Sequence, residues 1–180
     1  AALIEDNTLI AGNEDPAHVG DTVNGIYARA SQIIVRNNAQ ILGGHAVGGL
    51  GEGSVFGIHV WAPNANDVSS AVIEDNTIIA GTAKIRAYGL AIEMRTHAIV
   101  QRNIVFVCPF HGDDPRCKTG QRTGALVTTG NIDSLYANNW FFGGYAGTRT
   151  CTFGCPHNAQ NCFRLAEYYR FDGNLCHAPF

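Results

Sequence analysis

Histidine and carboxylate side chains recur in the Gly-rich stretches between the apolar segments of this chain. Four of them form a candidate glycan site, namely His45, His111, Asp113 and Asp114. Paired carboxylates on one surface can act as general acid and general base on a glycosidic bond. Carboxylates can also bind calcium for a lyase-type reaction. The spacing is not diagnostic, because Asp113–Asp114 before Pro115 is equally typical of a turn.

A second set of candidates lies in the apolar segments themselves. His59, Glu93 and Arg95 are predicted to face outward, and Trp61 and Trp140 are aromatic rings that can stack on sugars. Trp140 sits inside a strand motif, so we expect it to be partly buried. The chain has no phosphate-binding Gly-rich loop before a helix and no serine in a nucleophile elbow. The sequence therefore favours a protein without enzymatic activity.

A repeated phrase predicts the elements that must position these residues. Residues 3–12 read LIEDNTLIAG and residues 72–81 read VIEDNTIIAG. The shared unit is an apolar residue, two residues, asparagine, one residue and an apolar residue. Its asparagines are Asn7, Asn38, Asn76, Asn103, Asn139 and Asn174. Their uneven spacing favours a β-solenoid, in which loops bulge from a corner while the strands stay stacked.

A second strand signal alternates with the asparagine motif. It reads GIYA (25–28), GIHVW (57–61), GLAIEM (89–94), GALVTT (124–129) and CFRLAEY (162–168). These segments predict two short strands in each coil and almost no helix. We expect one all-β domain over residues 1–180. Because the chain opens inside a strand motif without a methionine, we expect a processed product or a fragment of a longer chain.

Long segments follow the asparagine motif and hold the loop candidates. They are residues 12–23, 43–55, 108–123 and 143–160. Because they occupy the same place in successive coils, we expect them to emerge on one side of the solenoid. His45 and the 111–114 cluster would then lie near each other. The asparagines would lie at one corner and stack their amides into a hydrogen-bonded ladder.

The IxxNxI–loop–GIxV rhythm, with its Cys-bearing loops, resembles the right-handed parallel β-helix superfamily. This is the fold of pectate lyases, tailspikes and many bacterial surface proteins, and the chain looks most like the Cys-containing β-helix repeat domains of secreted bacterial surface proteins. The resemblance implies a right-handed parallel β-helix of about six coils, each roughly 4.8 Å from the next, with long loops on one side.

The resemblance also bears on catalysis. Polysaccharide lyases of this fold use acidic calcium ligands and a basic proton acceptor on one face. The equivalent positions in this sequence would be Tyr27, His59, Ala91 or Glu93, and Thr128. This mixture does not reproduce an acidic cluster, so lyase activity is not the favoured interpretation.

All six cysteines lie in the second half of the chain: Cys108, Cys117, Cys151, Cys155, Cys162 and Cys176. We interpret them as disulfide partners, which indicates an oxidising compartment and a secreted or cell-surface protein. Cys108–Cys117 is favoured because it closes one loop, and the pairing of the other four stays open. Cys176 is alternatively a buried thiol. Zinc on Cys151, Cys155 and His157 is less favoured, since no second such pair completes the site.

Composition narrows the function further. The formal net charge of −3 gives no electrostatic support for nucleic-acid binding, and no apolar run is as long as a membrane span. We expect a non-enzymatic extracellular solenoid, structural or adhesive, whose exposed ends pair with neighbouring repeats or stack into a filament or surface assembly. The alternatives are a polysaccharide lyase, hydrolase or epimerase, or a glycan-binding module. No cofactor and no metal centre is predicted, with calcium kept as an alternative.

Overall fold

The computed structural model describes residues 1–13, 22–46, 53–64, 66–83, 85–107, 122–129, 134–142, 150–151, 169–172 and 175–177. Every regular element in these ranges is a β-strand, so the expectation of an all-β chain is confirmed. The strands form three parallel sheets, which we name A, B and C. Over the same ranges, the structure contains no helix that is long and apolar enough to cross a membrane.

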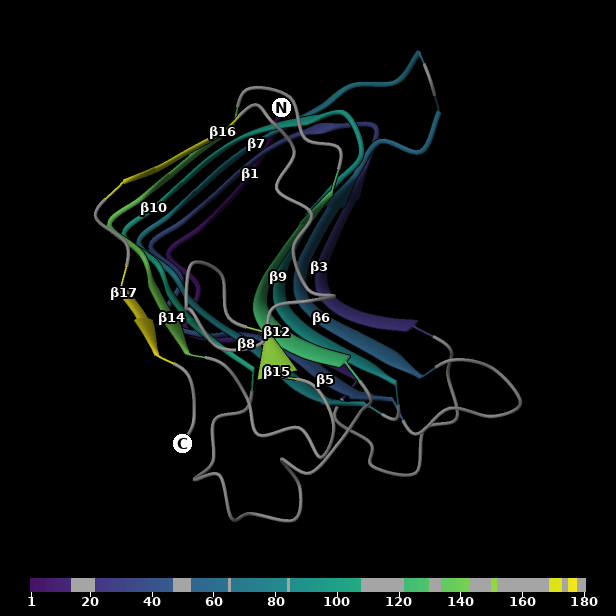
Figure 1. The fold of residues 1–180 in the computed structure, drawn as a ribbon, viewed down its shortest axis with the longest axis vertical. Helices are drawn as coiled ribbons and strands as arrows, with labels where there is room; N and C mark the ends of the chain where they lie inside the picture. The colour runs from purple at the N-terminus through teal and green to yellow at the C-terminus, as the bar shows by residue number, and fades with distance from the viewer. Residues whose placement is uncertain are drawn as a thin grey trace.

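Each sheet collects every third strand of the chain. Sheet A contains β1 (Ala2–Glu5), β4 (Gln32–Arg36), β7 (Ser69–Glu74), β10 (Thr96–Gln101), β13 (Ser134–Ala137) and β16 (Tyr169–Asp172). Sheet B contains β2 (Ile10–Asn13), β5 (Ile41–Ala46), β8 (Thr77–Ala83), β11 (Ile104–Phe106), β14 (Trp140–Phe142) and β17 (Leu175–His177). Sheet C contains β3 (Thr22–Arg29), β6 (Ser54–Trp61), β9 (Arg86–Glu93), β12 (Arg122–Thr129) and β15 (Thr150–Cys151). The chain therefore visits A, B and C in turn and returns to A, as Figure 1 shows.

The expectation of two strands per coil is wrong, because the asparagine motif is a corner between sheets A and B rather than one strand. The residue before each described asparagine of the motif has a positive φ, between 54° and 57°. These residues are Asp6, Asn37, Asp75, Arg102 and Asn138. A left-handed residue turns the chain and ends the strand. The apolar residues on both sides still point into one core, which is why the motif looks like a single alternating strand.

The core lies between the three sheets and is built from rows of stacked aliphatic side chains. Val35, Ile73 and Val100 form such a row on sheet A, and Ile41, Ile78 and Val105 form one on sheet B. Sheet C adds the row Ile58, Leu90 and Leu126. All nine side chains are fully buried. Burying each one contributes about 1.5–3 kcal/mol, so these rows hold successive coils in register.

The strands of sheet C bend along their length (Figure 1). Gly25, Gly57 and Gly89 form a column across sheet C, in which a Cβ on Gly25 or Gly57 would meet the carbonyl oxygen of the next glycine. A Cβ at Gly57 would lie 2.5 Å from the Gly89 carbonyl oxygen and 2.6 Å from Ile78 Cγ2 of sheet B. Only glycine therefore fits where the two sheets approach. Asn24 pairs with Phe56 and Ile26 pairs with Ile58, whereas Gly25 and Gly57 between them are left out of the strand pairing.

The fourth copy of the sheet C motif is one residue out of the expected register. Gly124 pairs with Tyr88, so Ala125 rather than Gly124 follows Gly89 in the column. Val127 consequently lies opposite Ala91, and Thr128 pairs with the inward Ile92 and is buried. The prediction that Thr128 occupies the outward position is wrong. A shift of one residue exchanges the two faces of a strand.

Candidate functional site

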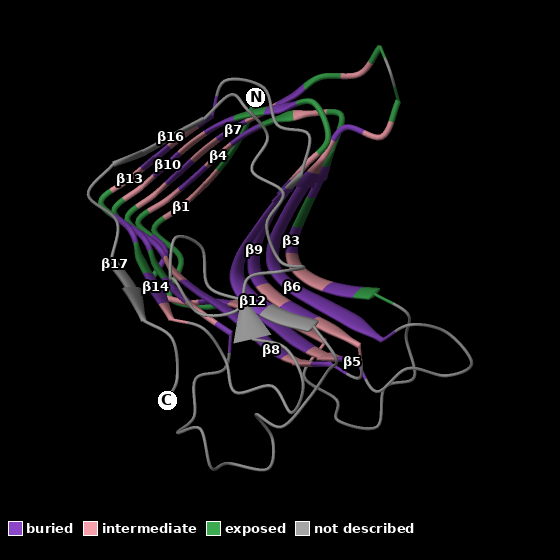
Figure 2. Cartoon of the chain, in the orientation of Figure 1, coloured by how far each residue is buried: buried purple, intermediate pink, exposed green. Residues whose placement is uncertain are grey.

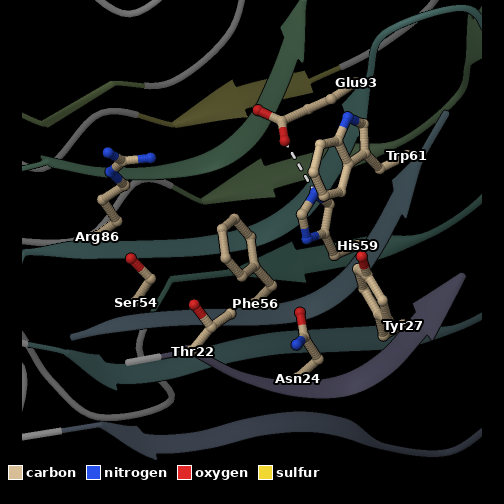
Figure 3. A pocket seen from close by; sticks show the side chains of 9 residues that line it. All are labelled: Thr22, Asn24, Tyr27, Ser54, Phe56, His59, Trp61, Arg86 and Glu93. Atoms are coloured by element: carbon tan, nitrogen blue, oxygen red, sulfur yellow. Dashed lines mark hydrogen bonds and ion pairs between the residues drawn. The ribbon is translucent and has the colours of Figure 1, made fainter. Parts of the chain in front are cut away.

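The outer face of sheet C contains a hollow of about 700 Å³, which we call the sheet C hollow. It is lined by Thr22, Asn24 and Tyr27 of β3, by Ser54, Phe56, His59 and Trp61 of β6, and by Arg86 and Glu93 of β9 (Figure 3). Its volume is in the range of small-molecule sites. β6 is buried along nearly its whole length, on both faces, as Figure 2 shows.

Strand register brings these side chains together. Tyr27 pairs with His59, and Arg29, Trp61 and Glu93 form the next outward row. Asn24 pairs with Phe56 on the other side of the glycine bend. Because parallel strands place matching positions one above the other, each row crosses the sheet at right angles to the strands. Three consecutive coils thus contribute to one site.

Aromatic rings form much of the wall of the sheet C hollow. His59 stacks on Phe56 with ring centres 4.5 Å apart and on Trp61 at 6.0 Å, where the two planes differ by 7°. Tyr27 is tilted against His59 at 5.4 Å, and its side chain is 47% exposed. The Arg29 guanidinium lies 5.6 Å from the centre of the Trp61 ring. Flat apolar faces of this kind suit a ligand with a flat apolar face of its own.

His59 and Glu93 are the polar pair of the hollow. His59 Nε2 lies 2.8 Å from Glu93 Oε2, and His59 is only 8% exposed. An ionised carboxylate only accepts hydrogen bonds, so Nε2 carries the proton and donates it. Figure 3 shows this bond joining β6 to β9. A histidine held by a carboxylate is oriented for binding or for proton transfer.

The loop-side glycan site predicted from the sequence is not part of this hollow. His45 lies on β5 of sheet B, where its Nδ1 is hydrogen-bonded to Thr82 Oγ1, and it is absent from the lining. His111, Asp113 and Asp114 lie outside the described residues. Of the outward strand candidates, the structure brings His59 and Glu93 together. Arg95 is exposed and donates from Nε to the Asp67 carbonyl at 3.2 Å instead.

The two tryptophans differ in their surroundings. Trp61 lines the hollow and its Nε1 donates to Met94 Sδ at 3.0 Å. Trp140 is on sheet B and is 51% exposed, which contradicts the expectation that it is partly core. It begins β14 on the outer face, where its ring meets Phe142 edge-on at 6.4 Å.

Five of the six motif asparagines stand in one row, which we call the asparagine row: Asn7, Asn38, Asn76, Asn103 and Asn139. The Nδ2 of each of the first four donates to the Oδ1 of the next asparagine at 2.8–3.0 Å. The backbone N–H of each of these donor residues is hydrogen-bonded to that same oxygen. Asn174 lies outside the described residues.

The cysteine and metal predictions fall largely where the structure describes nothing. Cys108, Cys117, Cys155 and Cys162 lie outside the described residues. Cys151 and Cys176 are placed as backbone in β15 and β17. Within the described ranges, no group of three or more His, Cys, Asp or Glu side chains is arranged to hold a metal ion.

Sequence reasoning missed Asn24 and Phe56 as site residues. Simple alternation, counted back from His59, assigns Gly57 and Val55 to the outer face and Phe56 to the inner face. The bend at Gly57 changes the phase, so Phe56 and His59 share the outer face although they are three residues apart. The repeated glycine in GIYA, GIHVW and GLAIEM is the signal that could have revealed the bend.

No family model matches this sequence, and no curated protein and no solved structure matches it. Function is therefore inferred from the chemistry of the sheet C hollow.

Proposed function

We propose that this chain is a right-handed parallel β-helix that works outside the cell as a non-enzymatic scaffold and binds glycans in the sheet C hollow. The observation that carries the proposal is the aromatic wall formed by Tyr27, Phe56 and Trp61 around a polar pair, His59 and Glu93. The cyclic order of the three parallel sheets supports the β-helix, and the six cysteines support an oxidising compartment.

Sugars match this lining because a pyranose ring is amphipathic. Its C–H face packs on aromatic rings, and its hydroxyl groups form hydrogen bonds around the edge. Tyr27 offers an exposed ring at the rim, while Phe56 is only 6% exposed and closes the base. The lining extends from the Thr22–Ser54–Arg86 row through the Asn24–Phe56 row to the Trp61–Glu93 row, so aromatic and polar groups both line it.

The scaffold part of the proposal is supported by the first coil. Oδ1 of each later asparagine in the row accepts two hydrogen bonds from the coil before it. Oδ1 of Asn7 accepts none from the residues that the structure describes. The first coil thus presents an unused acceptor beside the open edges of β1 and β2. A neighbouring repeat or a second copy that stacks head-to-tail would fill it.

A second candidate function is a polysaccharide-active enzyme, and the His59–Glu93 pair is the observation that favours it. A histidine whose Nε2 is held at 2.8 Å by a carboxylate is a suitable general base. Glycosidases use two carboxyl groups across the scissile bond, whereas the described lining contains one, Glu93. Binding without catalysis is therefore the simpler use of this hollow.

The test is a glycan array followed by titration of the best ligand. Trp61→Ala should abolish binding, because it removes an aromatic wall, and Trp140→Ala on sheet B is the matched control that should bind like the wild type. Binding that survives Trp61→Ala, or no binding to any glycan, would falsify the proposal. Release of shortened or unsaturated products from the bound glycan would establish the enzyme instead.

A further inference from the structure

The edge strand β1 has a near duplicate inside the solenoid. Residues 2–8 read ALIEDNT, and residues 71–77, two coils further along, read AVIEDNT. The backbone turns in the same way in both, since φ is 56° at Asp6 and 57° at Asp75. Among the described strands, β1 lies at one edge of sheet A, whereas β7 lies between β4 and β10 (Figure 2). The strand that covers β7 therefore shows what this sequence accepts on its open side.

β4 covers that side of β7 by backbone and asparagine contacts. The two strands pair in parallel, with Arg36 opposite Glu74. The Asn37 N–H donates to the Glu74 carbonyl oxygen at 3.2 Å. Asn38 donates to Asn76 Oδ1 from its backbone N–H at 3.1 Å and from its Nδ2 at 2.8 Å. A segment on this side must therefore supply donors at the asparagine corner.

The matching groups of the first coil have fewer partners. Asn7 Oδ1 accepts no hydrogen bond from the described residues. Asn7 Nδ2 contacts two acceptors within these residues, the Glu5 carbonyl oxygen and Asn38 Oδ1. Asn38 Nδ2 contacts three, because it also reaches the Ile4 carbonyl oxygen of the coil before it at 3.2 Å. A coil placed before Asn7 would supply both a donor and a carbonyl oxygen to this side chain.

Charges alternate along the same register. Glu5, Arg36 and Glu74 occupy one column across sheet A. Arg36 Nε donates to Glu5 Oε2 at 2.6 Å, and this bond, with the charges of Glu5 and Glu74, raises the pKa of Arg36. Asp6 is exposed next to Glu5 and makes the open edge more acidic. A cation opposite Glu5 would therefore stabilise a coil on this edge.

A second copy of the chain fits this register less well. The column continues through Gln101 and Ala137 to Asp172 on β16, which lies at the other edge of sheet A among the described strands. A copy stacked with its β16 against β1 would place Asp172 opposite Glu5. Like charges in such positions are unfavourable. The contacts of β4 with β7 therefore describe the better partner.

We propose that the open edge of β1 binds, in parallel, a solenoid coil that carries an arginine opposite Glu5 and an asparagine opposite Asn7, as residues 31–39 do for β7. This inference rests on the scaffold part of the proposed function and names the partner of the first coil. The arginine neutralises the acidic corner, and the asparagine lengthens the asparagine row by one member. The partner is another repeat of this kind and not the β16 edge of a second copy.

The test extends the chain by one coil. Residues 31–70 are duplicated and joined to Ala2, so the added Ser70 precedes Ala2 as Ser70 precedes Ala71 in the parent sequence. Hydrogen exchange of the β1 amides is then compared in the extended and parent proteins. We expect this exchange to slow about tenfold or more, because β1 is no longer an edge strand. Unchanged exchange in a folded extended protein overturns the inference.

The charge preference is tested in the added coil. Arg36→Glu in that coil should speed β1 exchange about threefold or more, because an acid then faces Glu5, and salt should narrow the difference. Gln32→Glu in the added coil is the matched control, since it lies on the same outer face of the strand and pairs with the uncharged Ser70. Equal effects of the two changes would overturn the selection of a basic partner.

The asparagine contact is tested by Asn7→Ala in both proteins. In the extended protein this change should lower the folding equilibrium constant about tenfold more than in the parent, because the added Asn38 then loses its acceptor. Equal losses in the two proteins would overturn the asparagine contact. Urea unfolding followed by circular dichroism measures the four proteins.

A second measurement covers an extended chain that does not fold. The synthetic peptide of residues 31–46 is added to the parent protein and should slow the same β1 amides in a saturable way. If the peptide gives no protection and the extended chain does not fold, the inference is wrong.

Two outcomes separate this inference from its alternatives. Rods of the parent protein that disappear in Asn7→Arg would show a second copy on the edge and would overturn the choice of partner. If the added coil protects β1 as expected while no glycan binds on the array, glycan binding fails and this inference stands. If glycans bind and the added coil gives no protection, this inference fails alone.

Discussion

Asn76 Nδ2 donates a hydrogen bond of 3.0 Å to Asn103 Oδ1, at the corner that follows the next strand of sheet A. The same Nδ2 reaches the carbonyl oxygens of Val35 at 3.0 Å and Glu74 at 2.8 Å. Asn76 Oδ1 in turn accepts from the backbone N–H and the Nδ2 of Asn38. One buried side chain therefore joins three consecutive coils.

The first prediction concerns this residue. Asn76→Ala should lower the free energy of unfolding by about 3 kcal/mol or more, because it leaves buried N–H and C=O groups of neighbouring coils unpaired. Asn7→Ala is the control at the exposed end of the row, and it should cost less than about 1 kcal/mol. Urea unfolding followed by circular dichroism measures both. Similar losses for the two variants would mean that burial of the row has no energetic role.

The glycine column gives the second prediction. Gly57→Ala should destabilise the protein by about 1–3 kcal/mol, because the new Cβ would meet the Gly89 carbonyl oxygen at 2.5 Å. Ser70→Ala, on the outer face of β7, should change stability by less than about 0.5 kcal/mol. Thermal and urea unfolding of both variants provide the comparison. A fully stable Gly57→Ala protein would show that sheets B and C can separate at no cost.

The third prediction concerns pH. The Arg102 guanidinium bonds both oxygens of the Asp75 carboxylate at 2.7–2.8 Å and lowers the pKa of Asp75 below its ordinary value of 3.8. A lowered pKa in the folded state stabilises the protein above the unfolded pKa, and this stabilisation is lost as the pH falls through the folded pKa. Arg102→Ala should therefore reduce stability at pH 7, and its effect should fade as the pH drops below 3.8 and through the lowered folded pKa of Asp75.

The size of this effect is small, since both side chains are more than one third exposed. An exposed ion pair contributes less than about 1 kcal/mol, and salt weakens it further. Arg95→Ala is the control, because its guanidinium bonds a backbone carbonyl that does not titrate. The urea midpoints of the wild type and both variants are compared from pH 2 to pH 7. A pH-independent effect of Arg102→Ala would contradict the role of Asp75.

The fourth prediction concerns the proton on His59. Long-range proton–nitrogen NMR should show the neutral ring with its proton on Nε2, since Glu93 accepts it at 2.8 Å. In Glu93→Leu the fixed preference should disappear and both tautomers should be populated. Glu5→Leu, far away on β1, should leave the His59 spectrum unchanged. Observation of the proton on Nδ1 in the wild type would contradict donation from Nε2 to Glu93.

The fifth prediction concerns assembly. If the first coil accepts a second copy, the purified protein should form rods in electron microscopy, and Asn7→Arg should shorten or abolish them by placing a large charge at the stacking surface. Trp140→Arg is the control for an added charge on the exposed face of sheet B. Loss of the rods on reduction would give the cysteines a part in assembly. Discrete particles at all concentrations would contradict stacking of copies.

The sequence predicted the repeated strands, but it did not predict the corners and bends between them. The spacing of apolar residues around Asn76 and Asn103 was sufficient to align successive coils, because each coil buries the same face against the last. The left-handed residue before each asparagine was not predictable from alternation, since Asp75 and Arg102 have little in common chemically. The third strand of each coil was therefore missed.

The site residues likewise fall into those that the sequence predicted and those that depend on a bend. His59, Glu93, Trp61 and Tyr27 could be proposed from the sequence because they alternate with aliphatic residues in recognisable strands. The contribution of Phe56 depends on the bend at Gly57, which alternation does not encode. The register of β12 was missed for a related reason, as both Gly124 and Ala125 are small and only the pairing with Tyr88 distinguishes them.

The near identity of residues 3–12 and 72–81 has a consequence for inheritance. The coil that contains Asn38 lies between these two copies, so its neighbours on both sides carry almost the same surface. Unequal crossing-over between the two stretches of gene would add or remove two whole coils and leave every new junction with a partner that it already fits. Length in such a protein can change by genetic accident in discrete steps, without a period of selection to repair the core.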